Sequence, residues 1–522
     1  MKKTVSIMLT VLMLLALFAG CASKPAEAPT PADEGESADE AALQDFVFGV
    51  YNFTKVDPAE GYNGWGTIRY GVGETLFILD ENLAVTPWLA SDYKLSDDRL
   101  TWTIKLRDGV KFHNGNPMDG AAVKAELERL IGMNERASAQ LNVASITADG
   151  NSVSITTNEP NPTLLNALCD PYACIIDAAA DVDNNAYPVG TGPYVMKEYV
   201  DEVSAYLEPF AEYWGGTPAA KSVTIKGISD VDTLAMAMQN GELDAAYGVS
   251  YDTLDTFAND PAFEITQAAT ARVYSLFFNL QHEYISDENF RRAVCMMVDK
   301  ETYGAVLING AGTATKAAFP SALSYGDDSK MTDVPDYDPE GAKALLAENG
   351  YADTDGDGFL DKDGKKVSIR LVTYGRTGLP QSAQALQSAL QDIGIEVSYE
   401  QFDSVEPVLE AGDFDICAYA CVTTPTGDPQ SYLNSIAGID GNMNYGKYDN
   451  PEVQELLSQL AVEFDQTKRA ELATQIQQLI TKDSSYNFMF HLNMFMVTKA
   501  GVKGITQSPV DYYQITAKTA RG

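Results

Sequence analysis

The sequence predicts an α/β protein with two lobes. From about Asp45 onward, segments with the two-residue periodicity of strands alternate with segments of helical periodicity, which is typical of layered α/β folds with partly parallel sheets. The chain has 522 residues, 45% of them apolar, so it can bury a large core. At this length two lobes are favoured over one, and no internal repeat with a fixed period is visible.

The first half of this pattern contains strands, a hairpin and a capped helix. Strands are expected at 46–51, 101–106, 143–146 and 153–157. The last two are joined through Asp149-Gly150-Asn151, a strong turn signal, and therefore form a hairpin. Apolar residues with helical spacing run from 121 to 131 after Asp119, whose carboxylate is a good N-cap.

Further strand–helix units follow in the second half of the chain. They are strand 223–228 with helix 231–239, strand 367–373 with helix 379–393, strand 396–401 with helix 405–411, and strand 414–420. The last helix, at 465–482, is expected to pack on a core because its apolar residues share one face. These residues are Leu472, Ile476, Leu479 and Ile480.

The N-terminus has the features of a bacterial lipoprotein signal. Two lysines precede an apolar stretch at 7–19 that is too short for an ordinary membrane span. The following Gly20-Cys21 resembles a lipobox, so residues 1–20 are expected to be removed and Cys21 to carry lipid; a plain secretory signal is the alternative. Residues 21–42 contain three Pro and six acidic residues and are predicted to be a tether. The protein is therefore expected at the cell membrane, lipid-anchored on its extracytoplasmic face, which is the periplasmic side if the host has an outer membrane.

The composition excludes several classes of function. With 36 basic and 74 acidic residues the net charge is −38, which repels phosphate backbones, so nucleic acid is not expected as a partner. Three His are too few for the usual His-based metal and general-base sites. No nucleophile elbow, Walker loop, dinucleotide fingerprint or His-Glu-x-x-His motif is present. We expect a binding protein rather than an enzyme, with a two-carboxylate extracytoplasmic hydrolase and a pure interaction protein as the alternatives.

Five cysteines follow Cys21, and an odd number leaves at least one thiol free. They are Cys169, Cys174, Cys295, Cys417 and Cys421. The spacings within the two nearby pairs do not fit a zinc knuckle or a redox pair, and both pairs lie in apolar runs. Buried thiols are expected, and one local disulfide is the alternative.

The acidic segment 353–364 matches part of an EF-hand calcium loop. Acidic residues stand at its first, third, fifth and ninth positions, and Gly358 stands at the sixth. The twelfth position, where an EF-hand has a bidentate Glu, is Gly364. The candidate Ca²⁺ ligands are Asp353, Asp355, Asp357 and Asp361. A polar, glycine-rich hairpin is the alternative interpretation.

One long segment resembles the signature of a known family. Residues 100–118 run through a strand, an Arg-Asp-Gly turn and an Asn-Gly turn, and a helix follows them. This order resembles the family 5 extracellular solute-binding proteins, which are the receptors of bacterial ABC importers for peptides, nickel and related solutes. Further agreement lies at 189–194, 213–215, 241–244, Asn279 and 290–294. The glycines and aromatic residues of these blocks, such as Gly190 and Trp102, are expected to have structural roles.

The resemblance implies a two-lobed periplasmic-binding-protein-like fold of type II, with an extra subdomain in the first lobe. It places lobe I at 43–281, with the extra subdomain at about 73–189, lobe II at 282–490, and a return to lobe I at 491–522. A solute would bridge the lobes, and the closed form would dock on the permease subunits of the importer. No resident cofactor is implied, and a monomer is expected.

Within this family the chain is similar to the nickel and nickel-metallophore receptors at 65–76, 83–90 and 487–499. That similarity implies a nickel chelate or an opine-like metallophore as the solute, with arginines holding its carboxylates. Where the nickel receptors carry Asp-Pro-His, this chain reads Asp428-Pro429-Gln430, so any Ni²⁺ is expected to arrive already chelated. An oligopeptide or dipeptide is the alternative solute, with Asp428 meeting its amino terminus.

Nine residues are candidates for the solute site. Arginines bind carboxylates in bidentate geometry and are informative in so acidic a chain, while tyrosines offer apolar walls with a hydroxyl group. The candidates are Arg69, Tyr70, Arg136, Tyr172, Arg272, Tyr419, Asp428, Gln430 and Tyr445.

Overall fold

The computed structural model describes residues 43–180, 187–505, 507 and 509–522. The predicted signal at 1–20, the lipidation site Cys21 and the tether at 21–42 lie outside these residues. Among the helices described, none combines the length and the apolar character needed to cross a bilayer.

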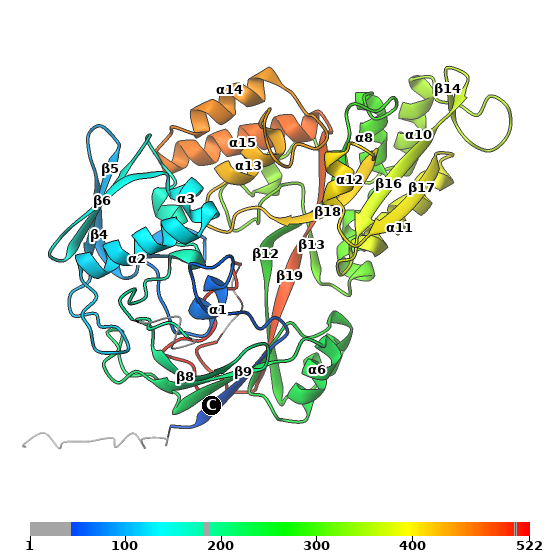
Figure 1. Ribbon diagram of the computed structural model, residues 1–522. Helices are drawn as coiled ribbons and strands as arrows, with labels where there is room; N and C mark the ends of the chain where they lie inside the picture. Colours follow the sequence, from blue (N-terminus) through cyan, green and yellow to red (C-terminus); the bar gives the residue numbers. More distant parts are fainter. Residues whose placement is uncertain (1–42, 181–186, 506, 508) are drawn as a thin grey trace, which may run out of the picture. The chain divides into compact units, whose positions relative to one another are not determined.

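An eleven-stranded mixed sheet is the largest sheet of the described part (Figure 1). Its strands follow the order β17 (Glu396–Phe402), β16 (Ser368–Tyr374), β18 (Ile416–Val422), β12 (Phe263–Phe278), β19 (Tyr486–Lys499), β11 (Ala245–Tyr247), β1 (Asp45–Val50), β10 (Ser222–Gly227), β9 (Ser204–Pro209) and β8 (Tyr194–Val200), with β13 (Gly312–Ala314) paired to β19. β1 is parallel to β10 and β11, and β16 is parallel to β17 and β18. The expected α/β class with partly parallel pairing is confirmed.

Two long strands, β12 and β19, connect the two halves of this sheet. One half consists of β17, β16 and β18, and the other consists of β11, β1, β10, β9 and β8. β12 has 16 residues and β19 has 14, and they run antiparallel side by side (Figure 1). On one side β12 pairs with β18, and on the other side β19 pairs with β11. The register of β12 on β19 shifts between Ala269 and Val273, where β12 forms a bulge. The bulge therefore lies between the two halves of the sheet.

Helices cover both halves of the large sheet. α11 (Leu379–Asp392) packs on β16, β17 and β18, and α6 (Val231–Gln239) packs on β1 and β11. α8 (Glu288–Met296) and α10 (Pro339–Glu348) pack against each other. The helices and strands predicted from residue 223 to residue 420 all occur, with ends that differ by one or two residues.

A second, antiparallel sheet of four strands lies within residues 73–189. Its order is β4 (Ala90–Leu95), β5 (Thr101–Leu106), β7 (Ser152–Thr157) and β6 (Val143–Asp149). β6 and β7 form the predicted hairpin. The predicted helix is α2 (Gly120–Met133), and the Asp119 carboxylate caps it by accepting hydrogen bonds from the N–H groups of Ala121 and Ala122 at 3.0 Å. α2 packs on β6 and β7 and is followed by α3 (Glu135–Leu141).

Three helices share a hydrophobic core with this four-stranded sheet. They are α13 (Gln430–Ala437), α14 (Pro451–Leu460) and α15 (Gln466–Lys482). The ring of Trp102 in β5 stacks on Phe464, with centroids 6.2 Å apart. In α15, Ile476 and Ile480 are buried, which confirms the predicted apolar face. The core thus joins parts of the predicted lobe I and lobe II, whose boundaries stay a prediction.

The remaining elements are short. They are α1 (Gly64–Arg69), β2 (Phe77–Leu79), β3 (Val85–Pro87), α4 (Leu164–Ala167), η1 (Pro171–Ala173), η2 (Tyr251–Thr253), α7 (Leu254–Ala258), α9 (Lys300–Thr302), η3 (Tyr303–Leu307), η4 (Asp328–Lys330), α12 (Glu406–Glu410), β14 (Asp361–Lys362) and β15 (Lys365–Lys366).

The five described cysteines are free thiols. Four are buried, and Cys421 is half-buried. Burial raises the pKa of every one of these thiols, which keeps them protonated and unreactive. The expectation of buried thiols is confirmed.

Two glycines of the 189–194 block allow backbone segments to approach closely. A Cβ atom at Gly190 would lie 2.1 Å from the carbonyl oxygen of Val72, and one at Gly192 would lie 2.4 Å from that of Gly71. Only glycine fits such contacts, so both residues have the structural role that the sequence predicts.

Candidate functional site

A cavity of about 250 Å³ lies against the bulge of β12. We call it the Arg272 cavity, after one of the residues that line it. Thr270, Ala271 and Arg272 of the bulge line it, together with residues near α1, residues that end or follow β16 and β18, and the segment 509–512. Its aromatic walls come from Tyr51, Trp65, Tyr247 and Tyr512. The cavity therefore gathers side chains from both halves of the large sheet.

Arg69, at the end of α1, is buried and lines this cavity. Its Nη2 donates to Asp511 Oδ2 at 2.8 Å, and its Nε donates to the Asp511 carbonyl oxygen at 3.2 Å. The guanidinium lies over the Tyr247 ring, 5.3 Å from its centroid, and the Tyr247 hydroxyl donates to the Asp511 carboxylate. Burial alone would lower the pKa of Arg69, but Asp511 and the neighbouring tyrosines together offset this and hold that pKa above its usual value. The charge of Arg69 is thus balanced within the cavity wall.

Arg272 lines the cavity from the bulge of β12. Side chains alternate between the two faces of a regular strand, and a bulge changes the direction of one of them. The Thr270 hydroxyl bridges the bulge, because it donates to the Leu492 carbonyl oxygen at 2.8 Å and accepts from the Arg272 N–H at 3.2 Å. The Ala271 carbonyl oxygen accepts from the Thr423 N–H at 2.7 Å. The bulge is therefore fixed on both sides.

Arg376 also lines the cavity, although the sequence did not single it out. It follows the end of β16, which is parallel to both of its neighbours. Ligand sites in α/β proteins gather outside the carboxyl ends of parallel strands. The position of Arg376 just after a predicted strand was therefore the feature that could have identified it from the sequence. Burial lowers the pKa of Arg376, but interactions with Tyr274 and Tyr374 raise it above its usual value, so the side chain stays charged.

Arg272 and Arg376 are not paired with carboxylates. Neither forms an ion pair within the described residues, whereas Arg69, Arg136 and Arg469 each do. Asp511 is the one acidic side chain among the described residues that line the cavity, and it is engaged by Arg69. Two positive charges consequently face the cavity without a counter-charge from the described structure. An anion with oxygen acceptors is the chemical group that such an arrangement accommodates.

Tyr70 does not line the cavity, although it follows Arg69 directly. Its side chain is fully buried in a hydrophobic core, where its ring stacks on Phe53 with centroids 5.6 Å apart. The reason is the helical turn at α1, which directs neighbouring side chains to different faces.

Arg136 and Tyr172 interact with each other away from the cavity. The Arg136 guanidinium forms a bidentate ion pair with Asp170 and lies 4.5 Å from the centroid of the Tyr172 ring. The Tyr172 hydroxyl donates to Gln140 Oε1 at 2.8 Å. Both predicted side chains are thus satisfied by protein groups, and neither lines the Arg272 cavity.

Asp428 and Gln430 belong to a buried cluster around Arg469. The Arg469 Nε lies 2.9 Å from Asp428 Oδ2, its Nη2 lies 2.8 Å from Asp428 Oδ1, and the same Nη2 donates to Gln430 Oε1 at 3.0 Å. Arg469 is 1% exposed and Asp428 is 5% exposed. Both candidates line a separate cavity of about 350 Å³. The Asp428 carboxylate is already engaged by Arg469.

Tyr419 and Tyr445 lie beside Phe277 rather than in the cavity. Their ring centroids are 5.1 and 6.5 Å from that of Phe277. The Tyr419 hydroxyl donates to Glu406 Oε1 at 3.1 Å. Of the nine candidates, Arg69 and Arg272 line the cavity at the bulge, and Arg376 joins them there.

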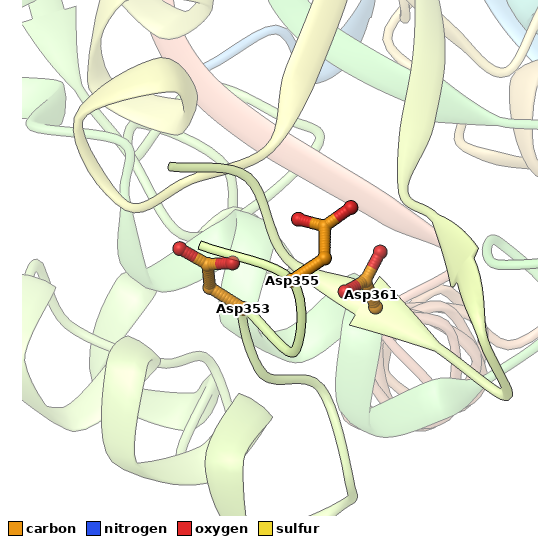
Figure 2. Close-up of side chains that lie close together, drawn as sticks. All are labelled: Asp353, Asp355 and Asp361. Atoms are coloured by element: carbon orange, nitrogen blue, oxygen red, sulfur yellow. The ribbon is translucent and has the colours of Figure 1, made fainter. Parts of the chain in front are cut away.

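Three of the four candidate calcium ligands lie close together, as Figure 2 shows. One carboxylate oxygen from each of Asp353, Asp355 and Asp361 lies within 4.8 Å of the others. Asp357 is not part of this group, and its carboxylate lies 3.9 Å from Lys366 Nζ. The loop supplies three carboxylates but no bidentate twelfth ligand, so the fit to a Ca²⁺ ion is partial. Calcium binding here stays a prediction.

Comparisons with known proteins agree with this description. The family model of the bacterial extracellular solute-binding proteins, family 5 (middle part), matches residues 84–444. The nickel-binding protein NikA of Staphylococcus aureus is 27% identical over 454 residues, which cover 87% of this chain and 89% of the relative. The oligopeptide-binding protein AppA of Bacillus subtilis is 27% identical over 538 residues, which cover 98% of each chain. The crystal structure of a nickel ABC transporter from Bacillus halodurans aligns with a TM-score of 0.80 and 30% identity, covering 91% of this chain and 100% of that one.

The family match covers more than half of the chain, and the fold agrees with a solved structure over most of its length. The expected two-lobed, periplasmic-binding-protein-like fold is confirmed. A family of solute-binding proteins also agrees with the expectation of a binding protein rather than an enzyme. The chain belongs to the bacterial extracellular solute-binding proteins of family 5.

Proposed function

We propose that this chain is the solute receptor of an ABC importer and that it binds an anionic solute through Arg272 and Arg376. The observation that carries the proposal is that both arginines line one cavity and have no carboxylate partner among the described residues. Both side chains are half-buried. A charge that is partly withdrawn from water without a counter-charge is unfavourable, so folded proteins ordinarily pair such groups unless a ligand supplies the partner. The nickel-binding and oligopeptide-binding relatives support the receptor role.

The position of the cavity suits a receptor that closes on its solute. Arg69 and Arg376 approach it from different halves of the large sheet, and Arg272 lies on the strand between them. A solute that contacts all three touches both halves and favours the state in which these contacts form together. Permease subunits of the importer would recognise that state, with the receptor acting as a monomer.

The solute is a nickel chelate or an opine-like metallophore in this proposal. Guanidinium groups would hold its carboxylates in bidentate geometry, and the aromatic walls would cover its apolar parts. No His is among the described residues that line the cavity, so the protein offers Ni²⁺ no imidazole ligand, and the metal would enter with its ligands already bound. Met494, which also lines the cavity, offers a thioether.

A short peptide is the second candidate, and the similarity to an oligopeptide-binding protein favours it. Its carboxyl terminus would bind the same arginines. The predicted partner of its amino terminus, Asp428, is paired with Arg469 and lines a different cavity. Asp511 is the acidic group that such a peptide would meet in the Arg272 cavity.

Thermal unfolding in the presence of candidate solutes tests the proposal. Ni²⁺ with carboxylate chelators is expected to raise the Tm of the purified protein, and Arg376→Gln is expected to reduce the rise. Arg292→Gln is the matched control, because Arg292 does not line this cavity and donates to the backbone carbonyl oxygen of Asp333. Stabilisation by short peptides but never by chelates would replace the chelate with a peptide. An equal rise in the Arg376→Gln variant would refute the site.

The receptor is lipid-anchored through Cys21 in this proposal. The anchor keeps it beside the permease on the extracytoplasmic face of the membrane. Mass spectrometry of the mature protein is expected to find Cys21 as the first residue, carrying a diacylglycerol group. Cys21→Ser is expected to release the protein from the membrane fraction, and a variant that stays bound to the membrane would contradict the anchor.

A further inference from the structure

We infer that the solute has a net charge of minus two. This inference rests on the proposed function and deepens it, because it gives the size of the solute's net charge and not only its sign. It follows from the ionisable side chains that line the Arg272 cavity.

The described lining contains three cations and one anion. The cations are Arg69, Arg272 and Arg376, and the anion is Asp511. Arg69 and Asp511 form an ion pair at 2.8 Å and cancel each other. Two positive charges remain, and no described carboxylate lies within ion-pair distance of either.

The neighbouring tyrosines do not reduce this charge. Tyr247 lines the cavity, and Tyr274 and Tyr374 interact with Arg376. Burial raises the pKa of all three hydroxyls above the usual value, and that of Tyr374 is about 12. They are therefore neutral at physiological pH, and the described lining has a net charge of plus two.

A solute that matches this charge is favoured over one that does not. A neutral chelate or a zwitterionic peptide would close the cavity over two uncompensated guanidinium groups, which is unfavourable. A compact dianion gives each group a charge-assisted hydrogen-bond acceptor. The acidic surface of the protein does not cancel this preference, because exposed charges farther away than about 8–10 Å are largely screened at physiological ionic strength.

Two chelates of the same ligand provide the test. The hexadentate EDTA complexes of Ni(II) and Co(III) are similar in shape, but the nickel complex carries two negative charges and the cobalt complex carries one. Isothermal titration is expected to show that the wild-type protein binds the nickel complex about tenfold more tightly, since Coulomb energy is proportional to the product of the charges. Titrations with oxalate, malonate and succinate are run in parallel as simple dianions.

Variants of the lining are expected to change the ratio of the affinities for the nickel and cobalt complexes in opposite directions. Arg376→Gln lowers the charge of the lining to plus one, so the ratio is expected to fall to about threefold. Asp511→Asn raises it to plus three, so the ratio is expected to rise to about thirtyfold. A gain of selectivity in Asp511→Asn is not what a loss of structure would cause. Arg292→Gln is expected to keep the wild-type ratio.

The outcomes separate this inference from the proposed function. If both chelates bind the wild-type protein equally and Arg376→Gln weakens both equally, the site is right and the charge count is wrong. If neither chelate nor any of the three dicarboxylates binds the wild-type protein, both proposals are overturned. A ratio that follows the charge of the lining through the three proteins supports the inference.

Discussion

A buried arginine, Arg469, and two half-buried arginines, Arg272 and Arg376, are placed in opposite ways. Arg469 is 1% exposed and meets Asp428 through several short contacts, with Gln430 and two backbone carbonyl oxygens taking its remaining donors. Arg272 and Arg376 line a cavity and have no carboxylate partner among the described residues. The first cluster is complete within the chain, and the second has no counter-charge among the described residues.

Under the proposed function, the paired cluster stabilises the fold, and the unpaired arginines bind the solute. Removing one partner of a complete buried pair leaves the other charge unpaired and destabilises the folded protein. Removing a charge that has no partner does not destabilise the folded protein. The two clusters should therefore respond to substitution with opposite signs. Stability and affinity measurements on the same variants distinguish them.

The largest effect is expected at the complete cluster. Asp428→Asn leaves Arg469 buried without its counter-charge, so the free energy of unfolding should fall by about 3–5 kcal/mol. Urea denaturation measures the change. The double variant Asp428→Leu/Arg469→Met is expected to lose less than Asp428→Asn, since it leaves no unpaired charge. A loss below about 1 kcal/mol in Asp428→Asn would place this cluster in the same class as the cavity arginines.

The cavity arginines should affect binding and not stability. Arg272→Gln and Arg376→Gln are each expected to weaken binding of the anionic solute by about 1.5–3 kcal/mol, the usual contribution of a hydrogen bond to a charged group. Without solute, the free energy of unfolding should be unchanged or slightly higher. Calorimetric titration and urea denaturation give the two values. A variant that unfolds more easily and binds as before would reverse the assignment.

A smaller effect is expected from Thr270, whose hydroxyl holds the bulge that carries Arg272. Thr270→Val removes this hydroxyl at nearly constant volume and should weaken solute binding by about 1 kcal/mol. Thr270→Ser should restore it. In an Arg272→Gln background, Thr270→Val should have no further effect on affinity, since Thr270 acts through Arg272. Additive losses in the double variant would show an effect that is independent of Arg272.

The smallest effect is expected at the acidic loop, whose carboxylates are exposed except for Asp361. Ca²⁺ in millimolar concentration should raise the Tm by about 1–2 °C, because a weak site in a protein of this size stabilises it little. EGTA should reverse the rise, and Asp355→Asn should remove it. Identical melting curves with Ca²⁺ and with EGTA would leave the polar hairpin as the correct interpretation.

Local patterns predicted the elements that depend on local chemistry. The N-cap at Asp119, the turn at Gly150 and the apolar face of 465–482 each act within a few residues, so the sequence alone places α2, the β6–β7 hairpin and α15. β12 and β19 carry no comparable signal, because their pairing is determined by residues more than 200 positions apart. The central connection of the sheet was therefore not predictable from local pattern.

The same limit applies to the site. Arg69 and Arg272 were found because arginines are informative in so acidic a chain, but nothing local shows that Arg136 is paired with Asp170 while Arg272 is not. Asp428 was proposed to meet a peptide amino terminus, and the partner that engages it lies 41 positions away. Arg376 was missed because its role comes from the end of β16 and not from a motif.

Native mass spectrometry of the protein purified from its own cells tests whether Arg272 and Arg376 bind an anionic solute. An anionic small molecule is expected to be bound to the wild-type protein and absent from the Arg272→Gln/Arg376→Gln double variant. A neutral or cationic molecule, or equal occupancy in the two proteins, would contradict it.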